Sequence, residues 1–298
     1  MASLREIKDR IASVRSTLKI TSAMKLVASA KLRKAQRAIE GMRPYENALA
    51  DILVAAQYGG ISPEPPMDLA SPEQPQGEAP QNHQAPTAVV AIASNSSLCG
   101  AFNANVIRKT LETLRACEGE VEVYPLGRRM AEALRRAGYT CPADYNDLIG
   151  HPSYDKSAAL ARSLAERYQA GEQSRVILVY NRFVSTTSQL PTVEPYLPFS
   201  ADKLAELGAD AAPEAQDYIL EPDAQALVDQ LLPQVMMLKF HAAILDSAAA
   251  EQAARTIAMQ TASDNAEDLL GELTLEYNKG RQQKITAEIL DLLGGAAN

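Results

Sequence analysis

The side chains most able to do chemistry are three cysteines and three histidines, and none lies in a recognised catalytic or metal-binding pattern. They are Cys99, Cys117, Cys141, His83, His151 and His241. The cysteines form no CxxC pair, and their odd number does not indicate a disulfide framework. The histidines have no second ligand at metal-binding spacing. The sequence also contains no GxGxxG, GxxxxGK[ST], GxSxG or HExxH motif. We therefore expect no catalysis, no metal site and no cofactor in this chain.

The central part of the chain, residues 88–215, is predicted to be an open α/β domain of the Rossmann-like kind. Short apolar runs such as AVVAIAS (88–94) and RVILVYNRFV (175–184) alternate with amphipathic stretches such as FNANVIRKTLETLRAC (102–117). Strands that alternate with helices are typical of a mostly parallel sheet. The turn after the first strand, SNSSLCGAFN (94–103), has one glycine, whereas phosphate-binding loops usually need several. We therefore interpret this turn as a strand-to-helix connection and not as a nucleotide site.

Both ends of the chain are predicted to be long helices that pair as an antiparallel coiled coil. Apolar positions keep a heptad spacing in residues 1–58, and a second heptad in residues 216–298 runs to Tyr277 and restarts in a new phase at Ile285. Heptads of this length indicate a coiled-coil partner. Polar residues interrupt the two heptads at Thr21, Lys25, Glu46, Gln252, Thr256 and Ser263. The second helix, longer by about 16 residues, is expected to extend roughly 24 Å beyond the N-terminus.

Proline and glycine mark the expected breaks. Residues 59–87 contain seven Pro, three Gly and no Lys or Arg, which is a linker composition. Pro44 and Pro233 lie inside the helical patterns, and we expect each to bend its helix because an interior proline removes a hydrogen bond. The sequence has no apolar run near the roughly 18 residues of a membrane span and no signal-peptide core, so a soluble, cytosolic chain is expected.

Charge separates the two predicted helices within a chain of net charge -8. Residues 1–57 hold 11 basic and 5 acidic residues, and residues 223–298 hold 5 basic and 11 acidic residues. We expect the helices to be electrostatic complements, so that much of the basic charge has an intramolecular partner. Antiparallel pairing gathers a basic collar of Arg5, Lys8, Arg10, Arg15, Lys19, Lys279, Arg281 and Lys284.

The most basic stretch, residues 16–38, carries six positive charges and no acid. In it, Ile20, Met24 and Val27 lie off the heptad, so the helix is apolar on more than one side at this level. This pattern indicates contact either with a neighbouring part of the same chain or with another protein.

Five stretches of the sequence resemble the γ subunits of F-type ATP synthases. They are ITSAMKLVASAKLRKAQ, SLCGAFNANV, SAAAEQAARTIAMQTASDNA, YNKGRQQKIT and ITAEILDLLGGA. They occur in the family's order over nearly the whole chain. One departure is visible, because Asn95, Ser96 and Ser97 stand where the family commonly has Asp-Arg-Gly before Leu-Cys-Gly.

The resemblance implies a non-catalytic rotor shaft that couples proton flow through a membrane sector to ATP synthesis or hydrolysis. It implies a coiled coil inside a ring of α and β subunits, with the ε subunit and the membrane c-ring as further partners and one copy per complex. It also implies a peripheral position on the cytoplasmic side of a bacterial inner membrane. Family contact positions, a basic helix face and the apolar tip give the expected subunit contacts: Met24, Arg33, Lys34, Arg281, Gln282, Ile285, Ile289 and Leu292. For Arg33 and Lys34 a solvated helix face is the alternative.

Two other classes of function fit parts of the sequence. A coiled-coil protein with a basic arm for nucleic acid would bind duplex DNA with a strong dependence on salt. An enzyme that uses the α/β domain for a nucleotide would bind ATP or NAD saturably, although no nucleotide motif supports it.

Overall fold

The computed structural model describes residues 3–58, 85–141, 145–199, 221 and 223–295. Most of the predicted linker (59–84) and the predicted boundary before the C-terminal helix (200–220) lie outside these residues, so the predicted domain limits stay predictions. Packing divides the chain into two units. The mixed unit is residues 31–254, and the helical unit is made of residues 1–30 and 255–298.

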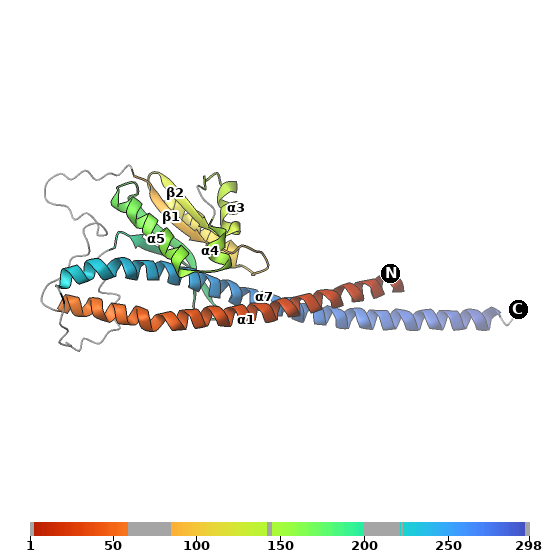
Figure 1. Ribbon diagram of the computed structural model, residues 1–298. Helices are drawn as coiled ribbons and strands as arrows, with labels where there is room; N and C mark the ends of the chain where they lie inside the picture. The colour runs from red at the N-terminus through yellow and green to blue at the C-terminus, as the bar shows by residue number, and fades with distance from the viewer. Residues whose placement is uncertain (1–2, 59–84, 142–144, 200–220, 222, 296–298) are drawn as a thin grey trace. The chain divides into compact units, whose positions relative to one another are not determined.

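The mixed unit is built on a four-stranded sheet with the strand order β2-β1-β3-β4 (Figure 1). The strands are β1 (Thr87–Ile92), β2 (Val121–Leu126), β3 (Arg175–Phe183) and β4 (Gln189–Leu197). β1 is parallel to both β2 and β3, whereas β4 returns antiparallel to β3. Pro191 and Pro195 lie on β4 at one edge of the sheet, where a residue that lacks an N–H is tolerated. The predicted, mostly parallel sheet is confirmed.

Helices cover both faces of this sheet, which is why every residue of β1 is buried. α2 (Phe102–Ala116) and α3 (Arg128–Arg136) pack on one face, where Val106 and Leu134 share a core with Val89 and Val123. α4 (Asn146–Gly150) and α5 (Tyr154–Gln169) contribute to the core on the other face. α4 was not predicted, because five residues are too few to show a helical period.

The two terminal helices, α1 (Leu4–Tyr58) and α7 (Ala224–Gly295), each run through both units. Both helices continue past their internal prolines, Pro44 and Pro233. In the mixed unit, Leu53 of α1 and a long row of α7 side chains share the core of the α5 face. The buried α7 side chains of this core are Val228, Leu232, Val235, Met236, Leu238, Phe240, Ala243 and Ile244.

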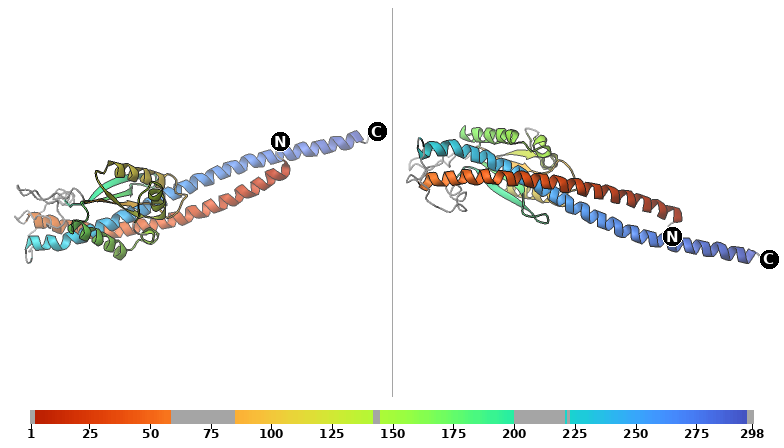
Figure 2. Two further views of the ribbon diagram at one scale, coloured as in Figure 1. Left: turned by 90° about the horizontal axis from the view of Figure 1, so that it is seen from above. Right: turned by 60° about the horizontal axis from the view of Figure 1, so that its bottom comes forward.

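That row is wider than the heptad predicts, because α7 packs both against the sheet and against α1 (Figure 2). Val228 and Val235 are heptad positions, but Leu232, Phe240 and Ile244 are not, and each of these three is at most 1% exposed. A heptad describes contact with one partner helix, so it underestimates burial where a helix has two partners.

In the helical unit, α1 and α7 pack against each other along one narrow stripe. The buried residues there are Ile7, Thr21 and Ala28 on α1 and Arg255, Met259, Ser263, Ala266 and Leu273 on α7. Arg255 lies off the predicted heptad. The other neighbouring members of this stripe are separated by multiples of seven or by steps of three and four, as the heptads predict. Three contacts give the direction of pairing. Leu4 lies against Gly280, Thr21 against Ser263, and Lys25 against Gln260, so residue numbers rise along one helix as they fall along the other.

The pairing is therefore antiparallel. It leaves about 15 residues of α7, from Arg281 to Gly295, beyond the start of α1, or roughly 22 Å of helix. The sequence predicts a length close to this.

Candidate functional site

The surface of α1 in the helical unit carries large apolar side chains that the chain itself does not cover. Ile20, Leu26 and Val27 are 58%, 68% and 56% exposed, and Met24 is half-buried. The sequence left open whether Ile20, Met24 and Val27 contact a neighbouring part of the chain or another protein. The exposure of Ile20 and Val27 favours another protein, because large apolar side chains that the chain leaves exposed at neighbouring helix positions often mark an interaction site.

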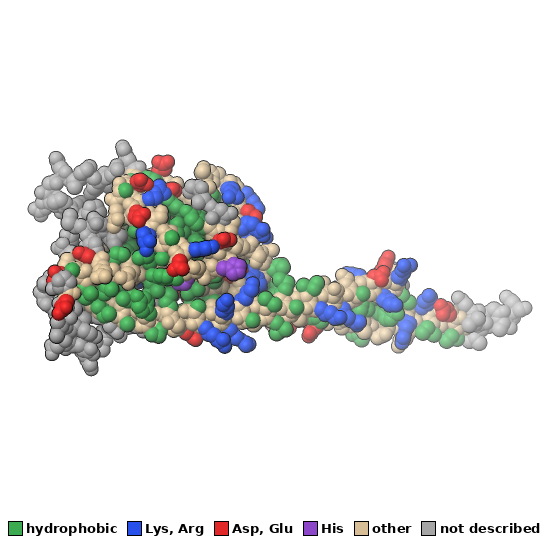
Figure 3. Space-filling view, in the orientation of Figure 1, with side chains coloured by type: hydrophobic (Ala, Val, Ile, Leu, Met, Phe, Trp, Pro, Cys, Tyr) green, Lys and Arg blue, Asp and Glu red, His purple; other side chains and the backbone are tan. Residues whose placement is uncertain are grey.

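The basic residues of α1 are not paired with the acids of α7. Of the ten described Lys and Arg side chains of α1, none forms an ion pair with a described residue, and only Lys25 makes a hydrogen bond, to Gln260. The expectation that the two helices neutralise each other by direct contact is therefore wrong for this part of the chain. On the face drawn in Figure 3, blue Lys and Arg side chains instead lie outward, among green apolar ones, along the helical unit.

Arg33 and Lys34 belong to the part of α1 in the mixed unit, and both are exposed. Neither has an ion pair or hydrogen bond with a described residue. Their neighbour Leu32 is buried against Ala249 and Ala253 of α7. The two charges thus lie on the outward face of a helix that is fixed on its inner face.

The predicted contact residues near the C-terminal end of α7 are all accessible. Arg281 and Gln282 are exposed, and Ile285 and Ile289 are 46% and 51% exposed. The side chain of Leu292 lies outside the described residues, although α7 itself continues to Gly295. Every described side chain from 281 to 290 is exposed, so this end is a single helix without a partner in the described part of the chain.

The basic collar is likewise exposed in full. Among its members only Lys284 forms an ion pair with a described residue, Glu288 on the next turn at 3.8 Å. A pair this exposed contributes at most about 0.5 kcal/mol, so the collar keeps most of its charge available.

Two polar contacts cross the buried stripe of the helical unit. The hydroxyls of Thr21 and Ser263 are 2.8 Å apart and both residues are buried, while Thr21 Oγ1 also donates to the Leu18 carbonyl. Lys25 Nζ donates to Gln260 Oε1 at 2.7 Å, and Gln260 Nε2 donates to Asp264 at 2.6 Å. Thr21, Lys25 and Ser263 are among the polar interruptions of the predicted heptads. Matching the interruptions of one helix to those of the other would have found the Thr21–Ser263 pair but not the partner of Lys25, because Gln260 is not an interruption.

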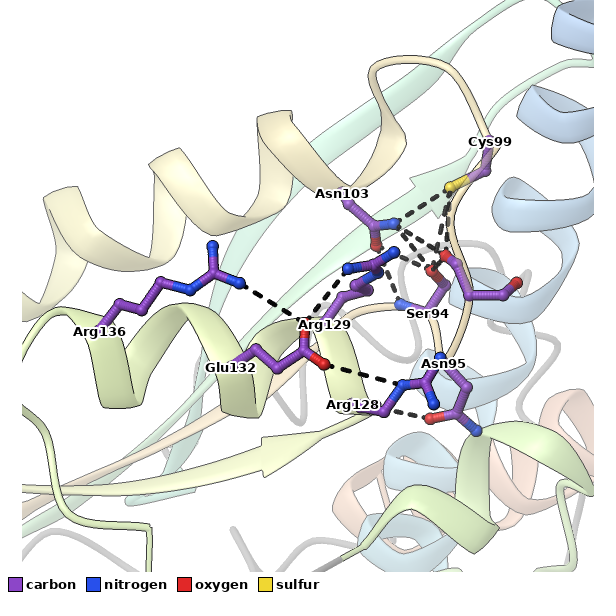
Figure 4. Close-up of polar contacts among 9 residues, drawn as sticks. Ser94, Asn95, Cys99, Asn103, Arg128, Arg129, Glu132 and Arg136 are labelled. Carbon is purple, nitrogen blue, oxygen red and sulfur yellow. Dashed lines mark hydrogen bonds and ion pairs between the residues drawn. The ribbon is translucent and has the colours of Figure 1, made fainter.

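The carboxyl end of β1, where open α/β sheets often bind nucleotides, is closed by its own side chains (Figure 4). Asn103 of α2 accepts from the Ser94 N–H and donates to Ser94 Oγ, to the Ser96 carbonyl and to the Cys99 thiol. The same turn also contacts the start of α3, which follows β2. Asn95 Oδ1 accepts from the Arg128 N–H at 3.0 Å, and the Ser94 carbonyl accepts from the Arg129 N–H at 3.1 Å. The N–H groups at the start of α3 are thereby occupied and do not point to an anion.

Gly127 brings the loops after β1 and β2 into contact. Its φ is +102°, and a Cβ at this position would lie 2.2 Å from the Ala93 carbonyl oxygen. No other residue fits so close an approach. The single glycine that the sequence shows in the turn after β1, Gly100, therefore does not identify the tight point of this edge.

Asn95 also explains one departure from the pattern of related sequences. Its Nδ2 donates to the Asn146 carbonyl at 2.8 Å while its Oδ1 accepts from Arg128. An aspartate at 95 would accept in the same way but could not donate. The side chain therefore joins three segments: the turn after β1, the start of α3 and α4.

Arginines are concentrated on α3. Glu132 is shared by Arg128, Arg129 and Arg136 at 3.8, 3.2 and 3.8 Å (Figure 4). One carboxylate does not neutralise three guanidinium groups, so α3 keeps a positive surface.

A polar cluster holds β2 to the end of α5. Arg167 pairs with Glu122 at 2.9 Å and contacts the Tyr124 hydroxyl, while Gln173 donates to both Glu122 and Tyr124. Burial raises the pKa of Glu122, but the hydrogen bonds from Arg167 and Gln173 outweigh it and leave the pKa lowered. Burial, followed by the nearby charge of Glu122, raises the pKa of Tyr124 to about 12.

The contacts of the buried His241 of α7 explain why a histidine stands at this position. Its Nδ1 lies 2.8 Å from Ser157 Oγ of α5, and the Tyr154 ring meets it edge-on at 5.6 Å. Burial lowers the pKa of His241. It is a packed core histidine that joins α5 to α7. Among the described residues, no group of three or more His, Cys, Asp or Glu side chains is arranged to hold a metal ion.

Comparison with known proteins gives the family. The ATP synthase family matches residues 3–298. The γ chain of the ATP synthase of Phocaeicola vulgatus is 44% identical over 300 residues, covering 99% of each chain, and that of Flavobacterium johnsoniae is 38% identical over 299 residues, covering 99% of this chain and 98% of the relative. The chain belongs to the ATP synthase γ chain family. The resemblance carried by the five sequence stretches is confirmed.

Solved structures agree with this family at the level of the fold. A chain of the Euglena gracilis mitochondrial ATP synthase, in a structure of OSCP, F1 and c-ring, has a TM-score of 0.61 at 19% identity and covers 99% of this chain and 93% of its own. The rotor of the same organism gives a TM-score of 0.58 at 19% identity over 95% of this chain and 98% of its own. In the described part of this chain, no helix is both long enough and apolar enough to cross a membrane.

Proposed function

We propose that this γ chain is the central rotor shaft of an F1Fo ATP synthase and that it performs no chemistry itself. One observation carries the proposal. The helical unit pairs α1 with α7 along a buried stripe, yet the described Lys and Arg side chains of α1 form no ion pair with a described residue, and Ile20, Leu26 and Val27 stay more than half exposed. A helix pair held from within and unsatisfied on its outside fits a shaft enclosed by other subunits.

The heptad spacing of buried residues supports a coiled coil as the form of this pair. Ala28 and Ala266 are buried small residues that allow close approach of the two backbones, and Thr21 with Ser263 supplies a satisfied polar layer. Coiled coils commonly use one such polar layer to fix how two helices pair. An antiparallel coiled coil would give the shaft the stiffness that torque requires.

The mechanism follows from asymmetry. A shaft with different side chains around its circumference presents a different surface to each catalytic β subunit, so three chemically identical sites become inequivalent. Rotation then exchanges their affinities for ADP with phosphate and for ATP. This is a shift of conformational populations by rigid-body contact.

We assign two roles to the predicted contact residues. Met24, Arg33, Lys34, Arg281 and Gln282 would grip the ring. The guanidinium and ammonium groups can pair with carboxylates that come and go during a turn, while Met24 would supply an apolar contact and Gln282 a neutral hydrogen bond. Ile285, Ile289 and Leu292 would form a bearing, because apolar contact is not directional and so permits sliding.

The remaining partners would bind the mixed unit. The α and β subunits would surround the helical unit, while ε and the membrane c-ring would bind the α/β part and complete the rotor. Each complex would contain one γ chain. The chain would then lie peripherally on the cytoplasmic side of a bacterial inner membrane. Structures of the Tetrahymena thermophila and Euglena gracilis mitochondrial ATP synthases that contain a chain of similar fold also contain a c-ring, which supports this assignment.

The alternative functions lose support. A nucleotide-binding enzyme would use the carboxyl end of β1, where Asn103 and Gly127 instead bring the chain's own loops together. A nucleic-acid protein would use the unpaired basic residues of α1, but these also fit the shaft, and membership of the γ chain family favours the shaft.

Replacing Arg281 by Ala tests the grip. The variant should assemble normally but lose about tenfold in both ATP synthesis and ATP hydrolysis, because a charge-assisted hydrogen bond contributes roughly 1.5–3 kcal/mol. Lys109→Ala is the control, since Lys109 lies on α2 and among the described residues its only ion pair is with Glu112, at 4.0 Å. Rates are measured on reconstituted complexes matched for subunit content. Equal rates for Arg281→Ala and wild type would remove the collar from the mechanism.

A further inference from the structure

Glycine at position 280 makes room for the first helical residue of α1. A Cβ on Gly280 would lie 3.0 Å from Leu4 Cδ2 and 3.9 Å from Leu4 Cγ. The first of these distances is shorter than an ordinary contact between carbon atoms, so any side chain at 280 would meet Leu4 directly. The leucine thus occupies the space that the glycine leaves empty.

A second glycine in the same helix shows that this is not a general property of glycine in α7. Gly271 is exposed, and a Cβ there would meet nothing within 4 Å. Both positions are inside a helix, where glycine is the least favourable residue after proline. Only at Gly280 does a neighbouring side chain give a reason for the glycine.

Leu4 is held in place from its own side. The Ser3 N–H donates to Glu6 Oε2 at 2.9 Å and the Glu6 N–H donates to Ser3 Oγ at 3.2 Å, which is a complete capping box. One turn further on, Ile7 is only 4% exposed. The start of α1 is therefore a formed helical turn that packs on α7 and not a loose end.

This contact lies directly before the residues that the proposed function needs most. Arg281 and Gln282 follow Gly280, and every described side chain from 281 to 290 is exposed. The paired part of the helical unit thus ends at Leu4 and Gly280, and a single helix begins with Arg281.

We propose that Leu4 and Gly280 form a size-matched contact that fixes where the two-helix part of the shaft ends and so positions Arg281 and Gln282 for the ring. The two residues are positioning residues, because they act through the side chains that follow them. The inference rests on the proposed function in one respect only, namely that Arg281 and Gln282 contact the ring.

The contact and helix propensity make opposite predictions for a larger side chain. Leucine favours a helix more than glycine does, so propensity alone predicts that Gly280→Leu stabilises this end of the unit. The size-matched contact predicts the reverse, since the new side chain would displace Leu4 and the first turns of α1 with it.

Hydrogen exchange of the backbone amides of residues 7–14 in the purified full-length chain separates these predictions. Gly280→Leu should raise their exchange rate by at least about fivefold, because local packing sets local opening. Leu4→Ala in the same chain should restore the rate to within about twofold of wild type, since the small side chain returns the space. Gly271→Leu is the matched control and should not raise it.

Activity of the assembled complex tests the positioning. Gly280→Leu should lower ATP synthesis and hydrolysis as Arg281→Ala does, and the added Leu4→Ala should recover at least half of the loss. Unchanged or slower exchange in Gly280→Leu would overturn the contact. Faster exchange with wild-type activity would overturn the positioning, provided that Arg281→Ala is impaired. Wild-type activity of Arg281→Ala would instead overturn the grip in the proposed function, and exchange would still decide the contact.

Discussion

Replacing Asn95 by aspartate sets the structure against the pattern of related sequences. Asp is the residue that the family commonly has at this place, so restoring it would be expected to stabilise the chain if family preference were the only guide. Here, however, Asn95 donates to the Asn146 carbonyl at 2.8 Å and accepts from the Arg128 N–H at 3.0 Å. Aspartate keeps the second bond, loses the first, and faces the carbonyl with a carboxylate oxygen.

The expected cost follows from these two distances. Loss of the donated hydrogen bond costs about 1 kcal/mol, and two acceptors left facing each other at this distance add about 1–2 kcal/mol. A negative charge at the start of α3 returns about 0.3–1 kcal/mol. The net destabilisation is about 1–3 kcal/mol, which lowers the melting temperature by roughly 2–5 °C in a chain of this size.

Thermal unfolding of the purified full-length chain, followed by circular dichroism at neutral pH, measures this shift. Asn105→Asp is the matched control. It makes the same change of charge, but Asn105 accepts through Oδ1 from Arg108 at 3.4 Å, which a carboxylate does at least as well. A melting temperature for Asn95→Asp at or above that of Asn105→Asp would show that the bond to Asn146 does not stabilise the unit.

Three further experiments test the interior. Thr21→Val and Ser263→Ala, measured singly and together by urea unfolding, should show a coupling of about 1 kcal/mol, and strictly additive effects would contradict their hydrogen bond. Burial raises the pKa of Tyr124 to about 12, so folding favours its neutral form and this contribution to the free energy of unfolding should be lost as the pH rises from 10 to 12. Tyr124→Phe should make the free energy of unfolding fall less steeply over this range, and the same slope in both proteins would refute the assignment. Burial lowers the pKa of His241, so the unfolded chain binds more protons than the folded chain below about pH 6.5, and the free energy of unfolding should fall as the pH drops through that range. His241→Gln should reduce the slope of the free energy of unfolding against pH. An equal slope in both proteins would contradict the assignment.

Heptad spacing predicted the helical unit well because each helix there has one partner. The same rule was less complete for α7 in the mixed unit, where Leu232, Phe240 and Ile244 are buried although they lie off the heptad. Those positions face a second partner, and no local period records how many partners a helix will have. The mostly parallel sheet follows from strand–helix alternation, whereas the five-residue α4 is too short to leave a period.

Side-chain networks were beyond the reach of the sequence for a different reason. Asn95 joins segments that meet only after the sheet has formed, and Gly127 has a neighbour 34 positions earlier in the chain, Ala93. Their residue types are ordinary for turns, so nothing local distinguishes them. From the sequence alone Gly280 is only an unfavourable residue inside a helix, whereas the structure gives it a neighbour, Leu4.

The separation of charge between α1 and α7 shows how a correct count can lead to a wrong contact. The count is strongly asymmetric, yet no described Lys or Arg of α1 forms an ion pair with a described residue, and the stripe between the helices is apolar apart from a hydroxyl pair, Arg255 and the flanking Lys25–Gln260 bond. Cohesion of the helix pair and attraction to a surrounding ring are therefore assigned to different side chains. Because a hydrophobic stripe does not weaken when surface charges are screened, a ring could grip and release the outer charges in each rotation without loosening the shaft. If ion pairs between its helices held the shaft together, each contact with the ring would compete with some of these ion pairs and weaken the helix pair.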